Sequence, residues 1–159
     1  MIRVGSGFDV HAFGGVPPLI LGGVVVDDTR GLEATSDGDA VAHAVSDAVL
    51  GAANLGDMGT HFPSSDPRWV DANSLEMLSD VVRMASDVGV EVDFVDVTVV
   101  SESVRISDHR REIAAGIARA VGIDPALVSV KATSTDGLGF VGRDEGLAVL
   151  ATVTAHTTT

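Results

Sequence analysis

The sequence predicts a mixed α/β (α+β) domain in which helices cover one face of a sheet. Short apolar runs with strand-like alternation are interspersed with longer segments whose apolar residues recur every three or four positions. The 159 residues are enough for one domain with its own core, and no internal repeat or linker divides residues 1–159. We therefore expect about four main strands plus a hairpin, with the helices on one sheet face.

The first third of the chain reads as strands followed by a helix. Residues 2–10 alternate apolar residues with small or polar ones, which is typical of a strand. Residues 19–26 are apolar and follow Gly and Pro turn signals, so they are predicted to be the hairpin partner of that strand. A helix is predicted from 36 to about 54. Its apolar stripe consists of Val41, Val45, Ala48 and Ala52.

The remaining elements alternate between helices and strands. Residues 56–71 lack periodicity and contain Gly, Pro, Ser and Asp, so they are predicted to form a long loop, of the kind that often binds ligands. Helices are predicted at 73–88 and 108–122. Strands are predicted at 91–100, 128–134 and 146–154, and residues from about 155 to 159 are expected to form a frayed tail.

Composition excludes several classes of function. A net charge of −13 argues against nucleic-acid binding, which needs clustered Lys and Arg. No apolar run approaches the ~18 residues of a transmembrane helix, and the N-terminus does not resemble a secretion signal. We therefore expect a cytoplasmic protein that does not bind membranes. Because the chain has no cysteine, any metal ion must be held by Asp, Glu and His.

One set of residues matches a catalytic metal site. Asp9 and His11 are two positions apart in a predicted strand, so their side chains point to the same face. His43 lies on the predicted helix face opposite the apolar stripe and would complete the three protein ligands typical of catalytic zinc. Asp39 and Asp47, one turn to either side, would orient its ring or simply form a solvated acidic face. Spacing alone fits a surface aspartate and two ordinary histidines equally well.

Two further segments could bind ligands. Thr133, Ser134, Thr135 and Asp136 leave a predicted strand and could bind phosphate oxygens and a hard cation such as Mg²⁺ or Mn²⁺. The glycines that follow permit close backbone approach, and Arg143 could donate to phosphate in a bidentate way. The alternative is an ordinary glycine-rich turn. The segment 56–66 is the other candidate, and its alternative is a flexible acidic loop.

Taken together, these motifs resemble the 2-C-methyl-D-erythritol 2,4-cyclodiphosphate synthase family over nearly the whole chain. The resemblance is carried, in order, by Gly7–Phe13, Ser36–Asp39 with His43, Leu55–Gly59 and Lys131–Gly146. It implies metal-dependent conversion of 4-diphosphocytidyl-2-C-methyl-D-erythritol 2-phosphate to the 2,4-cyclodiphosphate with release of CMP, in the non-mevalonate isoprenoid pathway. It also implies a homotrimer with active sites between subunits.

The resemblance further implies roles for individual residues. Zinc would be held by Asp9, His11 and His43, and Asp136 would contact a second divalent ion, Mg²⁺ or Mn²⁺. Thr35 and Ser134 would take part in catalysis. Contacts with the cytidine diphosphate substrate would come from Asp9, Val10, His11, Thr35, Ser36, Asp57, Met58, Gly59, Phe62, Pro63, Ser64, Ser65, Asp66, Ser101, Glu102, Ser103, Val104, Arg105, Ile106, Ser107, Thr133, Ser134, Thr135, Asp136, Phe140 and Arg143.

The chain departs from the usual family pattern at several of these positions. Thr35 stands where family members usually have histidine, and Ser64 where they commonly have aspartate. Ser134 replaces the more usual threonine, and Val104 and Arg105 stand where Pro and Lys are usual. Two other functions are therefore kept open: a non-catalytic relative that binds zinc and nucleotide, and a zinc phosphoesterase that activates water.

Overall fold

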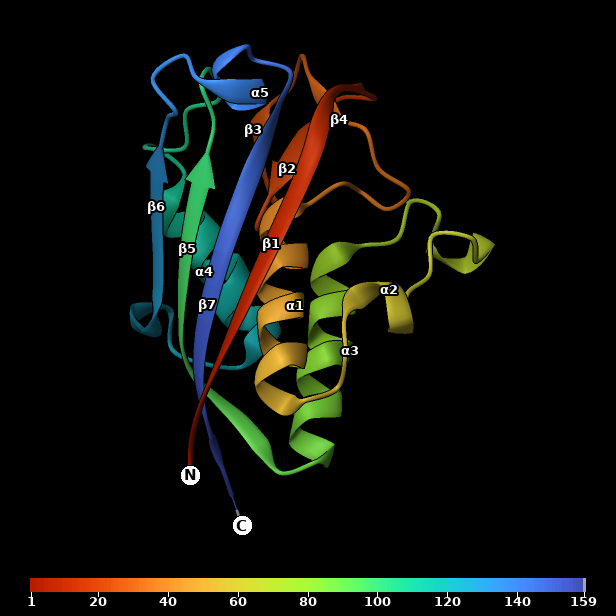
Figure 1. Ribbon diagram of the computed structural model, residues 1–159, viewed down its shortest axis with the longest axis vertical. Coiled ribbons are helices and arrows are strands. Elements are labelled where there is room, and N and C mark those ends of the chain that lie inside the picture. Colours follow the sequence, from red (N-terminus) through yellow and green to blue (C-terminus); the bar gives the residue numbers. More distant parts are fainter. Residues whose placement is uncertain (159) are drawn as a thin grey trace.

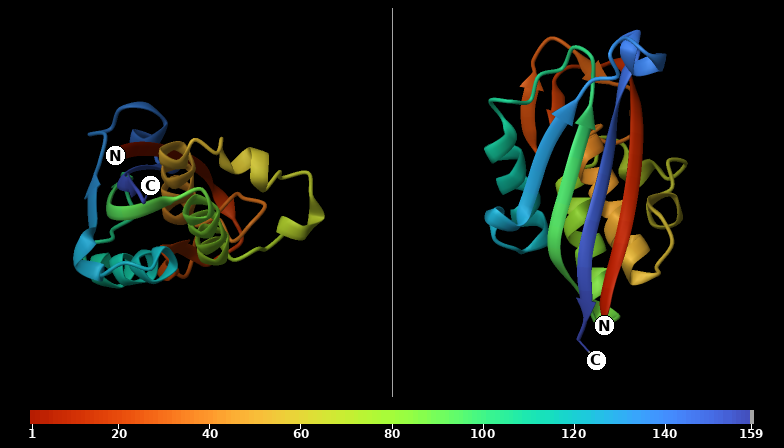
Figure 2. Two further views of the ribbon diagram at one scale, coloured as in Figure 1. Left: turned by 90° about the horizontal axis from the view of Figure 1, so that it is seen from below. Right: turned by 60° about the vertical axis from the view of Figure 1, so that its left-hand side comes forward.

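The computed structural model describes residues 1–158 and places a five-stranded sheet against three long helices (Figure 1). The strand order is β4-β1-β7-β5-β6. These strands are β1 (Ile2–Gly15), β4 (Gly31–Leu32), β5 (Val90–Val100), β6 (Val128–Thr133) and β7 (Gly146–Thr157). The long helices are α1 (Ala40–Ala53), α3 (Ser74–Asp87) and α4 (Arg110–Val121). All three helices lie behind the same sheet face, as predicted (Figure 2).

Shorter elements complete the fold. They are β2 (Leu19–Leu21), β3 (Val24–Asp27), α2 (Met58–His61), α5 (Gly139–Gly142) and the 3₁₀ turns η1 (Pro67–Trp69) and η2 (Pro125–Leu127). The predicted long loop at 56–71 therefore contains two short helical turns, each begun by an aspartate: Asp57 accepts from the Thr60 amide and Asp66 from the Arg68 amide. None of the helices in residues 1–158 is long and apolar enough to cross a membrane.

The predicted hairpin between the first strand and residues 19–26 is wrong. β1 instead pairs along its length with β7, antiparallel, from Ile2 opposite His156 to Ala12 opposite Gly146. The other edge of β1 pairs with β4. Residues 19–26 fold back on themselves as the separate β2–β3 sheet, because Gly22 and Gly23 adopt positive φ angles of 58° and 76° and make the turn between these strands.

The predicted frayed tail begins too early. β7 continues through Thr157, with Val153 and Ala155 buried in the core. The Thr157 amide donates to the Met1 carbonyl and the Thr158 amide to the Gly89 carbonyl. Residues 155–157 thus belong to the sheet, because the alternation of core and open-face residues extends to the end of the strand; Thr159 lies outside the described residues.

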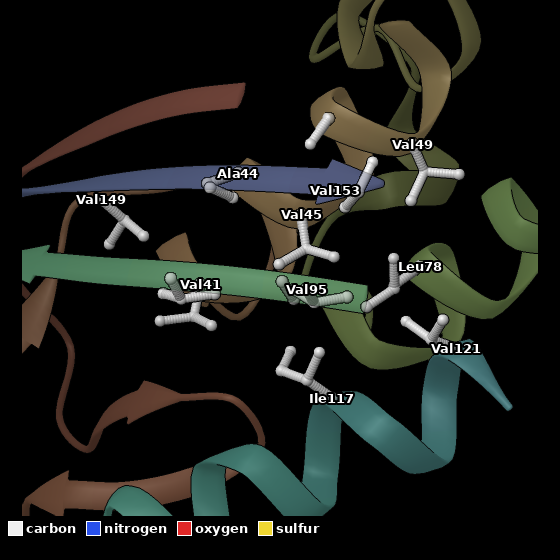
Figure 3. Close-up of a cluster of buried hydrophobic side chains, with 14 of the residues drawn as sticks. Val41, Ala44, Val45, Val49, Leu78, Val95, Ile117, Val121, Val149 and Val153 are labelled. Carbon is white, nitrogen blue, oxygen red and sulfur yellow. The ribbon is translucent and has the colours of Figure 1, made fainter. Parts of the chain in front are cut away.

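Helix α1 lies at the centre of the core. It packs against β1, β7 and α3, so far more of its surface is buried than the predicted four-residue stripe. Its buried residues Val41, Ala44, Val45 and Val49 lie among side chains from the sheet and from α3 and α4 (Figure 3). Only His43, Asp47 and Gly51 leave a partly or fully exposed line along it. That line is the polar face predicted for His43.

Alternation along β1 sets which side chains meet α1. Gly5, Gly7, Asp9 and His11 face the helix layer, whereas Val4, Phe8 and Val10 are exposed on the open face. A Cβ on Gly7 would lie 1.9 Å from the Ala44 carbonyl oxygen, and one on Gly5 would lie 1.9 Å from that of Ala48. The α1 backbone therefore packs directly on β1. This close approach brings His43 next to Asp9 and His11.

Both roles predicted for Asp39 are wrong: it neither orients His43 nor lies on a solvated face, and instead fixes the start of α1. Its side chain is fully buried and accepts from the amides of Gly22 (2.8 Å), Gly23 (2.7 Å) and Ala42 (3.0 Å). Burial raises the pKa of this carboxyl, although the three amide donors oppose that rise. Asp39 thus caps the helix and fastens it to the β2–β3 turn.

Replacing Asp39 with alanine is expected to lower the free energy of unfolding by about 2–3 kcal/mol, because three buried amides lose their acceptor. Denaturant unfolding measures this loss. Asp124→Ala is the control, since Asp124 caps the exposed η2 turn through a single amide, that of Ala126, at 2.8 Å. It should cost about 1 kcal/mol or less. Equal losses in the two variants would contradict the anchoring role of Asp39.

Candidate functional site

Asp9, His11 and His43 meet between β1 and α1. One ligand atom from each residue lies within 4.8 Å of the others. Asp9 Oδ2 is 2.8 Å from His11 Nε2 and 3.4 Å from His43 Nδ1, and the two imidazole ring centres are 5.7 Å apart. Strand alternation and helix packing, as predicted, bring the three side chains together.

The ring of each histidine is held by its other nitrogen. His11 Nδ1 is 2.8 Å from the Glu33 carbonyl oxygen, so this nitrogen carries the proton and Nε2 keeps a lone pair. His43 Nε2 is 2.9 Å from Ser74 Oγ and 3.1 Å from Ser36 Oγ. Asp47, which was predicted to orient His43, instead accepts from the Met58 amide at 2.7 Å and holds α2. Hydroxyl groups and a carbonyl therefore orient the rings.

The three residues fit a divalent metal ion. Asp9 Oδ2 and His11 Nε2 are buried and have no hydrogen-bond partner among the described residues, because their mutual alignment is not that of a hydrogen bond. Buried polar atoms are normally paired. Ligand atoms around tetrahedral zinc lie roughly 3.3 Å apart, which is comparable with the observed 2.8 and 3.4 Å. An ion bound by all three would satisfy both orphaned atoms.

The electrostatics of the triad are those of a cation site. Burial alone would raise the pKa of Asp9, but the adjacent imidazoles of His11 and His43 outweigh it and hold that pKa well below its usual range. Burial likewise would lower the pKa of His11, but Asp9 and the Glu33 carbonyl raise it above its ordinary value. Asp9 is therefore an anion that attracts a positive charge, either a proton on His11 or a metal ion.

A cavity of about 240 Å³ opens beside the triad of Asp9, His11 and His43, and we call it the metal-side cavity. Its lining includes residues predicted to contact the substrate, namely His11, Thr35, Ser36, Met58, Gly59, Phe62 and Ser64, together with His43. Sequence reasoning missed Ala34, Trp69 and Met77, which also line it. The Trp69 ring packs edge-on against the Phe62 ring, with 4.9 Å between the two ring centres. An aromatic residue inside the predicted ligand-binding loop was the available signal for Trp69.

A second cavity, of about 170 Å³, lies at the ends of β5 and β6. The residues predicted for the nucleotide that line it are Ser101, Val104, Arg105, Ile106, Ser107, Thr133 and Ser134. Ala132 and Arg110 also line it and were not predicted. Arg110 begins α4 and adds a second guanidinium to that of Arg105, so this cavity presents two cations in an acidic chain. The two cavities share no lining residue.

A family model described as the YgbB family matches residues 2–156. The chain belongs to the YgbB family. Curated relatives include the 2-C-methyl-D-erythritol 2,4-cyclodiphosphate synthases of Shewanella piezotolerans, 49% identical over 96% of both chains, and of Vibrio campbellii, 46% identical over 96% of this chain and 97% of that one. The resemblance predicted from the motifs is confirmed.

Solved structures of similar proteins share the fold. The bifunctional IspDF from Campylobacter jejuni superposes with a TM-score of 0.96 at 42% identity; the match covers 99% of this chain and 42% of that longer protein. IspF of Plasmodium falciparum in complex with CDP gives a TM-score of 0.86 at 28% identity, with 99% and 97% covered. The α/β architecture of this YgbB-family chain is thus the one seen in CDP-binding relatives.

Several residues predicted for the YgbB-family site lie outside both cavities. Besides Asp9 of the triad, these are Val10, Asp57, Pro63, Ser65, Asp66, Glu102, Ser103, Thr135, Asp136, Phe140 and Arg143. Asp136 adopts a φ of 52° and accepts from Ser134 Oγ at 3.2 Å, so it is hydrogen-bonded to a residue that lines the second cavity. Arg143 pairs with Glu145 at 3.0 Å, and Phe140 is exposed.

A network of polar contacts that the sequence did not predict holds the loop at 101–107, which lines the second cavity. Arg30 donates to Asp27 Oδ2 and to Ser103 Oγ, each at 2.8 Å, and stacks over Phe13 with 4.7 Å between its guanidinium carbon and the ring centre. Ser103 Oγ in turn donates to Asp144 at 2.5 Å. Three turns at one end of the sheet are thereby connected. Their separation in sequence left no local signal for this contact.

Proposed function

We propose that this YgbB-family protein is a 2-C-methyl-D-erythritol 2,4-cyclodiphosphate synthase. The observation that carries the proposal is the Asp9, His11 and His43 cluster, with its orphaned ligand atoms, beside a cavity whose lining includes seven of the predicted substrate residues. The identity of 46–49% to synthases over nearly the whole chain supports the same activity.

The proposed resident metal is zinc, held by Asp9, His11 and His43. When bound, zinc would supply a Lewis acid that polarises the β-phosphate of the substrate. The protein contributes two neutral imidazoles and one carboxylate, so the ion keeps a net positive charge toward an anionic ligand. The Glu33 carbonyl and the hydroxyls next to His43 keep both rings in place and reduce the reorganisation needed on binding.

The proposed reaction is an intramolecular phosphoryl transfer. An oxygen of the 2-phosphate bonds to the β-phosphorus, the bond from that phosphorus to the bridging oxygen breaks, and CMP leaves with that oxygen. The nucleophile is already an anion, so no general base is needed, and catalysis consists of positioning and charge stabilisation. We assign Thr35 to the metal-side cavity as an uncharged donor. Ser134 and Asp136 are assigned to the nucleotide side, with Asp136 contacting Mg²⁺ or Mn²⁺.

The proposed assembly is a homotrimer with shared active sites. The open sheet face exposes apolar side chains of Val4, Phe8, Val10 and Leu150, and Phe8 is opposite Leu150 in the β1–β7 ladder. Apolar faces of this kind are usually covered by a partner. The cavity beside the triad and the second cavity share no lining residue within one chain. This separation suits a substrate that is bound between neighbouring subunits. The cytoplasmic location suggested by the sequence stays a prediction.

The deciding experiment incubates purified protein with 4-diphosphocytidyl-2-C-methyl-D-erythritol 2-phosphate, Zn²⁺ and Mg²⁺ or Mn²⁺. Stoichiometric CMP and cyclic diphosphate, followed by ³¹P NMR, are expected. CDP binding by calorimetry without turnover would instead identify a non-catalytic zinc and nucleotide-binding relative. Hydrolysis of simple phosphate esters would identify a zinc phosphoesterase. Either outcome would overturn the proposed reaction.

Zinc affinity is expected to fall as the pH falls through the raised pKa of His11. Below that pKa the ring is protonated in the metal-free protein, so a proton must leave before zinc binds, and the affinity falls about tenfold per pH unit. Competition with a chromophoric chelator between pH 5.5 and 8.5 measures it. His156→Ala is the control, because His156 pairs with Asp93 at 2.8 Å and should leave the profile unchanged. A flat profile would contradict the prediction.

A further inference from the structure

A buried hydroxyl lies behind His43, on the side away from Asp9. Ser74 is the first residue of α3, is fully buried, and places its Oγ 2.9 Å from His43 Nε2. Asp37 holds this serine at two points: Oδ1 accepts from the Ser74 hydroxyl, and Oδ2 accepts from the Ser74 amide at 3.0 Å. Helix α3 thus contributes a side chain to a cluster otherwise built from β1 and α1.

Counting protons along this chain of contacts gives the tautomer of His43. The Ser74 hydroxyl has one proton, and the Asp37 carboxylate can only accept, so that proton lies between Ser74 and Asp37. Ser74 Oγ must then accept from His43, which places the imidazole proton on Nε2. The lone pair of the ring is therefore on Nδ1, the nitrogen 3.4 Å from Asp9 Oδ2.

We propose that Ser74 and Asp37 are positioning residues that fix His43 in the tautomer able to bind a metal ion through Nδ1. The proposal rests on the metal site proposed above. It concerns how the site is prepared before the ion arrives, and neither residue is a metal ligand. In the other tautomer Nδ1 would carry a proton toward the ion, and the ring could not bind it without first exchanging that proton.

Ser36 is the competing hydroxyl, and its geometry makes it the weaker influence. Its Oγ is 3.1 Å from His43 Nε2 and accepts from the Gly38 amide at 3.3 Å. If Ser36 donated to Nε2, the lone pair of that nitrogen would face the oxygen of Ser74 at 2.9 Å with no proton between them. This repulsion is absent when Nε2 carries the proton. Ser36 therefore adds a second acceptor without choosing the tautomer.

His11 provides an internal comparison. Its Nδ1 faces the backbone carbonyl of Glu33, which can only accept, so its tautomer is set by the main chain. That contact survives any side-chain substitution at position 33. The tautomer of His43 depends on two side chains instead, which makes it open to a direct mutational test.

The test compares Ser74→Ala with Ser46→Ala in the full-length, metal-free protein. Both serines are fully buried, but Ser46 Oγ donates to the Ala42 carbonyl at 2.8 Å within α1. Competition with a chromophoric chelator measures zinc affinity. Ser74→Ala is expected to weaken binding by about 10- to 100-fold, the usual effect of losing a partner of a metal-bound histidine. Ser46→Ala should stay within about threefold of wild type, and equal affinities for all three proteins would overturn the proposal.

Two further measurements separate a positioning role from a folding defect. Long-range ¹H–¹⁵N NMR of the metal-free protein at pH 8 reads the tautomer directly, and His43 should carry its proton on Nε2. Finding it on Nδ1 would overturn the proposal without any variant.

Asp37→Asn should weaken zinc binding when Ser74 is present and have little additional effect in the Ser74→Ala background, since Asp37 acts through Ser74. Independent, additive losses would contradict this.

The outcomes also distinguish this inference from the proposed function. A wild-type protein that binds no zinc would remove the proposed metal site itself. A wild-type protein that binds zinc, with a Ser74→Ala variant that binds equally well, would remove only the role of Ser74. If Ser74→Ala does not fold, Ser74→Thr keeps the hydroxyl, and its affinity should be within about threefold of wild type. A folded Ser74→Thr with strongly reduced affinity would contradict the proposal.

Discussion

Asp9→Asn is expected to abolish zinc binding at micromolar concentrations and to lower the CMP-forming rate by about 10³-fold or more. The substitution keeps the shape of the side chain and removes its charge. Asp9 Oδ2 lies 2.8 Å from His11 Nε2 and 3.4 Å from His43 Nδ1, and within residues 1–158 no other carboxylate belongs to the cluster. Steady-state turnover with added Zn²⁺ and chelator competition give the two values.

Asp93→Asn is the matched control for that variant. Asp93 lies on β5, is solvent-exposed, and pairs with His156 far from the triad. Its turnover and zinc affinity should stay within about twofold of wild type, because an exposed ion pair contributes little. An Asp9→Asn protein that kept more than a tenth of wild-type turnover would show that the carboxylate is not a necessary ligand, and the proposed mechanism would then be wrong.

The meeting of Asp9, His11 and His43 could be predicted from sequence because each step rests on a fixed period. Strand alternation puts Asp9 and His11 on one face, and the apolar stripe of the helix fixes the face of His43. The roles of Asp39 and Asp47 could not be predicted in this way. Their spacing from His43 suggested contact with its ring, whereas both carboxylates found backbone amides from other segments. Such amides are strong, obligatory donors that a side-chain pattern does not display.

Contacts between distant segments account for what the sequence did not reveal. Ser74 reaches His43 from α3, and Trp69 reaches the metal-side cavity from η1, although neither belongs to a recurring spacing with the triad. The β1 pairing was mispredicted for the same reason. A neighbouring apolar run predicted a local hairpin, while the actual partner, β7, lies more than a hundred residues away. Local patterns define elements well and define their partners poorly.

Gly7→Ala is expected to lower the free energy of unfolding by about 3 kcal/mol or more and to weaken zinc binding at the same time. The added Cβ would lie 1.9 Å from the Ala44 carbonyl oxygen and 2.9 Å from the Ala48 amide nitrogen. Both are backbone atoms of α1, so no side chain can rotate away and the helix must move. His43 directly precedes Ala44 on that same helix. A shift of the helix away from β1 therefore separates His43 from Asp9 and His11. Denaturant unfolding and chelator competition measure the two effects.

Gly51→Ala tests whether this effect belongs to the contact or merely to the loss of a glycine. Gly51 lies on α1 near the same strand, but its Cβ would meet only the Ser6 carbonyl oxygen, at 4.0 Å. Alanine favours the helix over glycine by about 0.8–1 kcal/mol, so this variant should be as stable as wild type or more stable, with unchanged zinc affinity. If Gly7→Ala behaved like Gly51→Ala, the direct packing of α1 on β1 would not be what holds His43 in reach of the strand ligands. Opposite signs in the two variants would tie the architecture of the site to one backbone contact.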